Sequence, residues 1–167
     1  MGQCGRTLAD SWACETHGEV AARTSSGSVL LAVRQDDAMT RRELVSSGAI
    51  WEPVVGYSRA VRVGQWVSVA GTTAAADGGG AVGGDDVGAQ AREALRRVVA
   101  ALEKVGAGPE HVVRTRIYVT DISRWEEVGR AHGEVFGEVR PATSMVEVSR
   151  LIDAALLVEI EADAVVA

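Results

Sequence analysis

The sequence predicts an α+β domain in which two helices cover one face of a mixed sheet, with the elements in the order β-β-α-β-α-β-β. Residues 87–105 and 123–136 repeat apolar side chains at helical spacing, and the segments around them alternate as strands do. Helices that alternate with strands pack on the sheet, and each parallel return is a right-handed crossover. Residues 39–167 are expected to form this domain.

The first two strands are expected to form a β-hairpin. Residues 57–63 alternate between two sides of an extended chain, and Gly64-Gln65 predicts the turn into a strand over residues 66–70. A glycine-rich loop over residues 77–86 separates this hairpin from the first helix.

The first helix is expected over residues 87–105. Asp85 or Asp86 can cap its start, because a carboxylate accepts hydrogen bonds from the unpaired N–H groups there. Gly106 and Pro109 are expected to end it, since glycine accepts the left-handed cap and proline cannot continue a helix.

The second half of the domain repeats this arrangement. Residues 111–120 predict a strand, Ser123-Arg124-Trp125-Glu126 has the spacing of a capping box, and residues 142–151 and 156–166 predict the last two strands. The face of the sheet without helices is expected to form an oligomer interface with polar pockets. We expect that face to present Arg114, Arg116, Tyr118, Thr143, Met145, Glu147, Glu159 and Glu161.

The composition excludes two classes of protein. The chain has 167 residues, of which 47% are hydrophobic and 24% charged. No apolar run approaches the ~18 residues that a membrane helix needs, so no membrane contact is expected. The formal net charge of −6 argues against a protein that coats nucleic acid, because binding to phosphates depends on Lys and Arg.

Residues 1–38 show no periodicity and are expected to be a disordered tail. Met39 could also begin the chain, in which case the tail is an artefact of the chosen start site. Cys4 and Cys14 both lie in this segment, so no disulfide is expected in the domain, and a reducing cytoplasm is the expected location.

A dinucleotide-binding loop is not expected, although Gly78, Gly80 and Gly83 match the G-x-G-x-x-G pattern before a helix. Asp85 and Asp86 follow the glycines and would repel a pyrophosphate at the helix N-terminus. We interpret the segment as a connecting loop.

Metal and covalent chemistry are not expected either. His17, His111 and His132 are isolated and no C-x-x-C occurs, so neither a metal nor a cofactor is expected. His132 lies on an apolar helical stripe and is interpreted as a packed core or interface histidine rather than a catalytic base. The domain has no cysteine and no G-x-S-x-G serine, so a covalent intermediate is not expected.

The remaining kind of catalysis is general acid–base chemistry, in which a side chain activates water. Glu159 or Glu161, held on a partly buried sheet face, could act as the base with a raised pKa. The alternative is a carboxylate that pairs across an interface with Arg114 or Arg116, and the sequence leaves both interpretations open.

Four stretches carry a family resemblance. They are Gly56-Tyr57-Ser58-Arg59-Ala60-Val61 with Val69-Ala70-Gly71, residues 112–121, Arg140-Pro141-Ala142-Thr143, and Val158-Glu159-Ile160-Glu161-Ala162. In this order, from Tyr57 to the C-terminus, they resemble the Rid (YjgF) family. The resemblance implies a chorismate-mutase-like α+β fold and a homotrimer with small-molecule pockets between subunits.

The resemblance also implies a reaction. The best-known Rid proteins hydrolyse reactive enamines and imines to 2-oxo acids and ammonia without a cofactor. By this resemblance Glu159 positions or activates water as the catalytic residue, and Tyr57 and Gly71 line the substrate pocket.

Two substrate-binding positions depart from the family pattern. In the best-known members an arginine after Pro-Ala binds the substrate carboxylate as a planar fork, and here Thr143 stands there. Met145 occupies a position where cysteine is frequent, so the pocket is expected to be larger and more apolar. Arg114 or Arg116, reaching in from a neighbouring subunit, could replace the lost guanidinium.

Three functional hypotheses follow. The first is a Rid-like hydrolase or deaminase, of a subgroup lacking the arginine, that acts on a small molecule other than the standard 2-imino acids. The second is a non-catalytic metabolite-binding or regulatory trimer. The third is an endoribonuclease, against which the net charge of −6 weighs.

Overall fold

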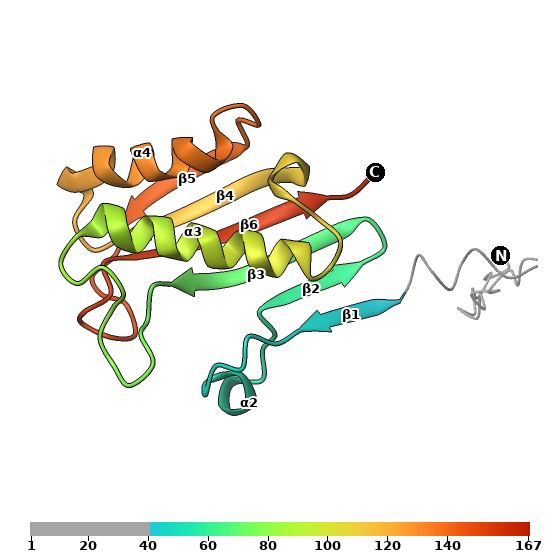
Figure 1. Ribbon diagram of the computed structural model, residues 1–167, viewed down its shortest axis with the longest axis horizontal. Helices are drawn as coiled ribbons and strands as arrows, with labels where there is room; N and C mark the ends of the chain where they lie inside the picture. Colours follow the sequence, from blue (N-terminus) through green and yellow to red (C-terminus); the bar gives the residue numbers. More distant parts are fainter. Residues whose placement is uncertain (1–40) are drawn as a thin grey trace, which may run out of the picture. The chain divides into compact units, whose positions relative to one another are not determined.

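The computed structural model describes residues 41–167 (Figure 1). The tail predicted over residues 1–38, with both cysteines, lies outside the described residues. Within the described part of the chain, no helix is long and apolar enough to cross a membrane.

Six strands form one mixed sheet in the order β1-β2-β3-β6-β4-β5. Neighbouring strands are antiparallel except β4 and β5, which are parallel and joined by α4. The elements are β1 (Arg42–Val45), α2 (Glu52–Val55), β2 (Ala60–Val63), β3 (Trp66–Thr73), α3 (Val87–Glu103), β4 (Val112–Val119), α4 (Trp125–Phe136), β5 (Ala142–Glu147) and β6 (Val158–Val165), with 3-10 turns at Pro109–His111 and Ile122–Arg124.

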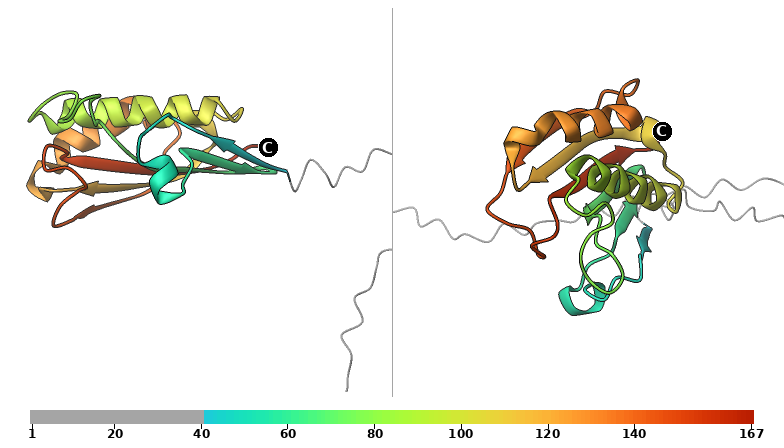
Figure 2. Two further views of the ribbon diagram at one scale, coloured as in Figure 1. Left: turned by 90° about the horizontal axis from the view of Figure 1, so that it is seen from below. Right: turned by 60° about the vertical axis from the view of Figure 1, so that its left-hand side comes forward.

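The two long helices cover one face of the sheet. The left view of Figure 2 shows α3 and α4 in a layer of their own, with the sheet edge-on beneath them. Among the residues that the structure describes, no long helix covers the other side of the sheet. We call that other side the open face. The order β2-β3-α3-β4-α4-β5-β6 confirms the predicted α+β fold.

The core lies between this helix layer and the sheet. Leu95 and Leu102 of α3 and Phe136 of α4 are almost fully buried, and they belong to one apolar cluster with Ile117 and Ile160 of the sheet. Burying side chains of this size contributes about 1.5–3 kcal/mol each. The helical stripes therefore determine which face of the sheet becomes the core.

Two elements were not predicted, namely β1 and α2. β1 pairs with β2 as an edge strand, and most of its side chains are exposed, so it lacks the apolar alternation by which a strand is recognised. α2 is a single turn with proline in its first turn, and it ends at Gly56, whose φ of 78° is left-handed.

The two helices start in different ways. Asp86 caps α3 as predicted, with its carboxylate accepting a 2.9 Å hydrogen bond from the N–H of Ala89. The predicted capping box at Ser123 is wrong, because α4 begins at Trp125 and the Ser123 hydroxyl donates to Asp121 instead. Asp121 thus caps the preceding 3-10 turn.

β5 is shorter than predicted, and its side chains face the opposite sides of the sheet from those predicted. It ends at Glu147 rather than at residue 151, because its partner β4 ends at Val119, which pairs with Glu147. β6 begins at Val158 rather than at residue 156.

The prediction that Thr143, Met145 and Glu147 lie on the open face is wrong. In the parallel register, Thr143 pairs with Thr115 and Met145 with Ile117, and both partners are buried beneath the helices. Directly paired residues point to the same face, so these β5 side chains lie on the helix side. The alternation along β5 was predicted correctly, but its two sides were assigned to the wrong faces of the sheet, because that assignment depends on how β5 pairs with β4.

One buried amide joins the loops to the sheet. Gln90 on α3 is fully buried; its amide nitrogen donates to the carbonyl oxygens of Gly84 at 2.6 Å and Ala155 at 2.8 Å. Its amide oxygen accepts from the N–H of Leu157 at 2.9 Å. Gln90 thus satisfies three backbone groups that would otherwise be buried without partners.

We expect Gln90→Leu to destabilise the protein by about 2–4 kcal/mol, because each unpaired buried polar group costs roughly 1–3 kcal/mol. Chemical denaturation measures the change in the free energy of unfolding. Gln65→Leu, at an exposed turn position, is the matched control and should stay within about 0.5 kcal/mol of wild type. Equal effects of the two substitutions would contradict the role given to Gln90.

Candidate active site

Glu159 is the central group of the candidate site. It lies on β6, points to the open face and is half-buried. Burial raises the pKa of its carboxyl above the ordinary value, and the neighbouring Glu161 carboxylate raises it further, while the Arg59 guanidinium acts in the opposite direction. A carboxyl group of this kind can exchange protons closer to neutrality than a free side chain can.

Gly71 provides the space that Glu159 occupies. The pairing of β3 with β6 shifts between Val69 and Thr72, which is a bulge at Gly71. A Cβ atom built on Gly71 would lie 1.9 Å from Oε1 of Glu159. Any side chain at residue 71 would therefore displace the carboxylate, so the position needs glycine for space.

Arg59 connects this bulge to Tyr57. Its Nη1 donates to the carbonyl oxygen of Gly71 at 2.6 Å and to Oγ1 of Thr72 at 2.8 Å. Its Nη2 donates to the hydroxyl of Tyr57 at 3.0 Å, and the guanidinium lies 5.5 Å from the centre of that ring. One side chain therefore positions two of the predicted pocket residues, Tyr57 and Gly71.

Sequence reasoning did not single out Arg59. The available signal is its spacing from Tyr57, because residues two apart in an extended chain point to the same side. What the spacing could not show is the long-range partner, since Gly71 lies on the next strand and becomes a neighbour only when the hairpin forms.

Glu161 and Arg116 form an ion-pair network beside Glu159. Nη1 of Arg116 lies 3.4 Å from Oε2 of Glu161 and 3.2 Å from Oδ2 of Asp163. The Tyr118 hydroxyl donates a long bond of 3.5 Å to Glu161, and burial raises the pKa of this phenol. Of the two glutamates that the sequence left open, Glu161 is thus the ion-paired one. Arg114 is exposed on the same face.

Thr143 belongs to a different cluster, on the helix side of β5. Its Oγ1 lies 2.9 Å from Oγ1 of Thr115 and 3.0 Å from the carbonyl oxygen of Pro141. The same Thr115 oxygen lies 3.0 Å from Nε2 of His132. Met145, next along this face, is half-buried against the core.

His132 packs as predicted. Its ring centre lies 4.8 Å from that of Phe136, and burial lowers its pKa, which favours the neutral imidazole.

The predicted site residues therefore form two groups within one chain. Tyr57, Gly71 and Glu159 come together around Arg59, with Arg116 beside them. Thr143 and Met145 lie on the opposite face of the sheet.

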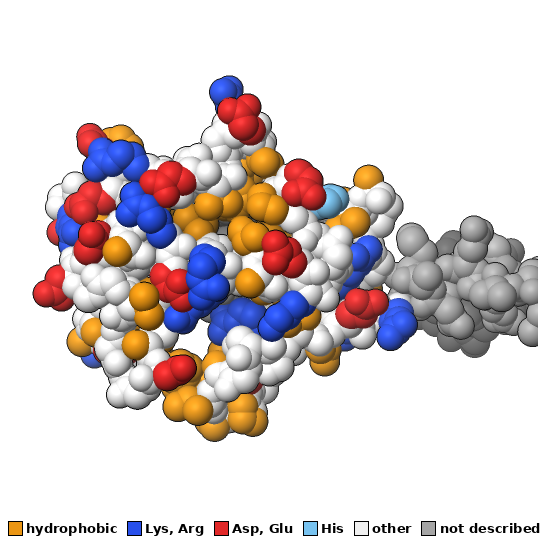
Figure 3. Space-filling view, viewed as in Figure 1, with side chains coloured by type: hydrophobic (Ala, Val, Ile, Leu, Met, Phe, Trp, Pro, Cys, Tyr) orange, Lys and Arg blue, Asp and Glu red, His pale blue; other side chains and the backbone are white. Residues whose placement is uncertain are grey.

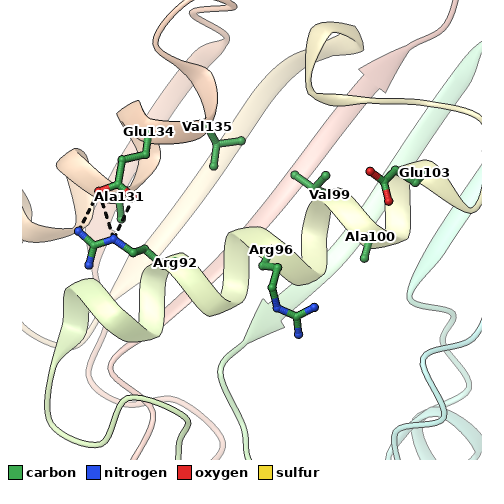
Figure 4. Close-up of a pocket in the computed structure, with 8 residues that line it drawn as sticks. All are labelled: Arg92, Arg96, Val99, Ala100, Glu103, Ala131, Glu134 and Val135. Carbon is green, nitrogen blue, oxygen red and sulfur yellow. Dashed lines mark hydrogen bonds and ion pairs between the residues drawn. The ribbon is translucent and has the colours of Figure 1, made fainter.

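The groove between the two long helices is a separate feature. It has a volume of about 450 Å³ and is lined by Arg92, Arg96, Val99, Ala100, Glu103, Ala131, Glu134 and Val135 (Figure 4). A bidentate ion pair between Arg92 and Glu134, with a shortest contact of 2.8 Å, bridges the helices. Across residues 41–167, no three His, Cys, Asp or Glu side chains lie close enough together to hold a metal ion.

Comparison with known proteins identifies the family. Residues 48–166 match the family described as Endoribonuclease L-PSP. The crystal structure of Rv2704 from Mycobacterium tuberculosis, described as a member of the YjgF/YER057c/UK114 family, is 60% identical, with a TM-score of 0.69 over 75% of this chain and 100% of its own. The chain belongs to the endoribonuclease L-PSP family, also called YjgF or Rid.

Two curated relatives of this YjgF-family chain are similar over most of their length. Uncharacterized protein SCO2049 of Streptomyces coelicolor is 41% identical over 72% of this chain and 89% of its own. The 2-iminobutanoate/2-iminopropanoate deaminase of Salmonella typhimurium is 36% identical over 65% of this chain and 86% of its own.

We expect Arg59→Gln to raise the pKa of Glu159 further, because the substitution removes the positive charge that favours the carboxylate. Carboxyl-carbon NMR titration of the folded protein measures that pKa. Arg130→Gln removes an exposed arginine from α4, outside the candidate site, and should leave the pKa of Glu159 unchanged. An unchanged or lowered pKa of Glu159 in Arg59→Gln would show that Arg59 does not act on this carboxyl.

Proposed function

We propose that this YjgF-family chain hydrolyses a small imine or enamine, with Glu159 as the base that activates water. The observation that carries the proposal is the placement of Glu159: half-buried, given space only by Gly71, and with a raised pKa. A raised pKa makes the carboxylate a stronger base for taking a proton from water.

Apart from water, this hydrolysis needs only protein groups that accept and donate protons. Water adds its oxygen to the carbon of the C=N bond, and Glu159 takes a proton from that water. That proton passes to the nitrogen, which gives a carbinolamine. The hydroxyl proton of the carbinolamine then moves to the nitrogen, and the carbon–nitrogen bond breaks to release ammonia as the carbon–oxygen double bond forms. An enamine enters the same sequence after a proton is added to its carbon and one is lost from its nitrogen.

Tyr57 can supply a proton to the substrate nitrogen. Its hydroxyl oxygen accepts from Nη2 of Arg59, so its own proton remains available to a ligand. The nearby guanidinium also stabilises negative charge that develops on the phenol oxygen.

The two separate groups of site residues support a pocket built from two subunits. Glu159 and Thr143 lie on opposite faces of one chain, so a ligand that touches both would need Thr143 from a neighbour. The open face also exposes apolar side chains that an interface would cover. These are Leu44, Val63, Trp66, Val146 and Val165. We propose the homotrimer of the family resemblance as this assembly.

Hydrogen bonding around Thr143 argues against a carboxylate as the bound group. The Pro141 carbonyl can only accept, so the Thr143 hydroxyl donates to it and must accept from Thr115. Thr115 has then used its proton and accepts from Nε2–H of neutral His132. Thr143 therefore offers a ligand only a lone pair, which suits an N–H or O–H group.

The relatives support the reaction class and leave the substrate open. The Salmonella protein is named as a deaminase of 2-iminobutanoate and 2-iminopropanoate. In this chain, Thr143 offers no positive charge to the carboxylate of such imino acids. We therefore propose an uncharged or amine-bearing imine as the substrate.

We expect wild type to accelerate the decay of an uncharged aldimine that an amine oxidase generates from benzylamine in situ. Glu159→Gln should lower that acceleration by about 10²–10⁴-fold, the usual contribution of a general base. Ammonia release measures the rate. The wild-type rate should rise with pH through the raised pKa of Glu159, because the base must be ionised.

Glu138→Gln, at an exposed position, is the matched control and should retain the wild-type rate. If Glu159→Gln retains it too, the role of this carboxylate is wrong. If the aldimine decays no faster with wild type than without protein, the proposed reaction is wrong.

We also expect wild type to act poorly on 2-iminopropanoate and Thr143→Arg to act on it at least about tenfold faster, because one charge-assisted fork contributes about 1.5–3 kcal/mol. Thr143→Lys is the matched control, since it adds the charge without the planar fork. Efficient turnover by wild type would overturn the proposed preference.

A further inference from the structure

A second cavity lies beside α3. Its volume is about 600 Å³, within the range of small-molecule pockets. Its walls are the C-terminal half of α3, the segment between β1 and α2, the glycine loop after β3 and Asp153, and its lining does not include Glu159. The proposed reaction makes no use of this cavity.

One wall of this cavity is cationic. It is lined by Arg96 and Arg97 of α3, by Lys104 at the C-terminal end of that helix, and by Arg59. Arg96 and Lys104 are eight residues apart and share one side of the helix, and in Figure 4 Arg96 points away from α4. Figure 3 shows Lys and Arg side chains gathered in the middle of this face of the molecule.

Small side chains keep the space between these cations open. Ala100 and Ala101 lie between Arg96 and Lys104 on α3, and both line the cavity. A larger side chain at residue 100 would project into the space where a ligand would lie.

All three arginines of the cavity are held in place without a ligand. Arg96 makes a bidentate ion pair with Glu93, with both contacts at 2.8 Å. Nη1 of Arg97 donates to the carbonyl oxygens of Thr73 at 3.0 Å and Ala75 at 2.9 Å, and its Nε lies 2.6 Å from Glu93. Arg59 is held by Gly71 and Thr72. Charged groups that are already positioned lose little entropy when a ligand binds.

Other residues of the cavity lining are acidic or aromatic. Asp77 and Asp153 line it from two loops, and Trp51 adds an apolar surface. The Trp51 segment is anchored by buried Glu52, which accepts from the N–H of Ser47 at 2.8 Å. Although burial disfavours its charge, hydrogen bonds from Ser46 and Ser47 lower the pKa of Glu52 to about 2, so the anchor stays charged at neutral pH.

This distribution of charge selects a ligand class. The cations of α3 suit phosphate or carboxylate oxygens. The carboxylates of Asp77 and Asp153 can only accept, so they suit ligand hydroxyl groups and repel a ligand that is anionic throughout. We propose that this cavity is a second ligand site, which binds a small hydroxylated anion such as a phosphorylated polyol or a hydroxycarboxylate.

The test is isothermal titration of the full chain with ribose 5-phosphate and, separately, with citrate. Saturable binding of either, with a Kd below about 1 mM, is expected. The stronger of the two identifies phosphate or carboxylate as the preferred anion. Ribose, which has the hydroxyls without the charge, should bind at least about tenfold more weakly than ribose 5-phosphate, a difference that corresponds to a single charge-assisted contact.

Variants locate the site. Lys104→Gln should weaken binding by about tenfold, and Ala100→Leu should abolish it by filling the cavity without a change of charge. Arg130→Gln removes an exposed arginine from α4, outside the cavity, and should bind as wild type does. Circular dichroism melting confirms that each variant is folded.

Three results would overturn the proposal. The first is no saturable binding of ribose 5-phosphate or citrate by wild type. The second is binding that Lys104→Gln and Ala100→Leu both leave unchanged, and the third is ribose bound as tightly as its phosphate. None of these results depends on imine hydrolysis, so the site fails or stands independently of the proposed reaction.

Discussion

The two-residue period of β6 is the constraint on which the rest of the structure depends. This strand lies between β3 and β4, and its alternate residues, from Val158 through Ile160 and Ala162 to Ala164, are almost fully buried beneath the helices. The residues between them are Glu159, Glu161 and Asp163. Because the core fixes one face, the three carboxylates can point only to the other.

That concentration of negative charge explains the cations around it. Arg116 pairs with Glu161 and Asp163, which leaves Glu159 with burial and a nearby carboxylate as the main influences on its pKa. Arg59, which directly precedes β2 and donates to the carbonyl oxygen of Gly71, partly offsets this negative charge. Arg59 also lines the cavity beside α3, so one guanidinium lies at the boundary of both proposed sites.

Thr143 is the residue at which the proposed pocket differs most from the pocket that the family resemblance implies. The chain has the YjgF-family architecture, with 60% identity to Rv2704 over 75% of its length. At residue 143 it has a hydroxyl whose proton is engaged by Pro141. This hydroxyl offers a ligand a lone pair in place of a positive charge, which is why the proposed substrate carries no carboxylate.

Local patterns were sufficient for most of the fold. Apolar spacing located α3 and α4, alternation located the strands β2 to β6, and Asp86 was a correct cap, because each of these depends on neighbours within a few residues. β1 was not predicted because most of its side chains are exposed, so its sequence lacks the apolar alternation of a half-buried strand. The C-terminal end of β5 was not predicted correctly because it depends on where its partner β4 ends.

The candidate site could likewise be predicted only in part from the sequence. The stretches around Tyr57, Gly71 and Glu159 could be recognised in the chain itself, and the structure brings all three together. Their connection through Arg59, the side of the sheet that Thr143 faces and the cavity beside α3 were decided only by the tertiary structure. The physical reason is that register and long-range contacts join segments far apart in the sequence, and a shift of one residue in pairing moves a side chain to the opposite face.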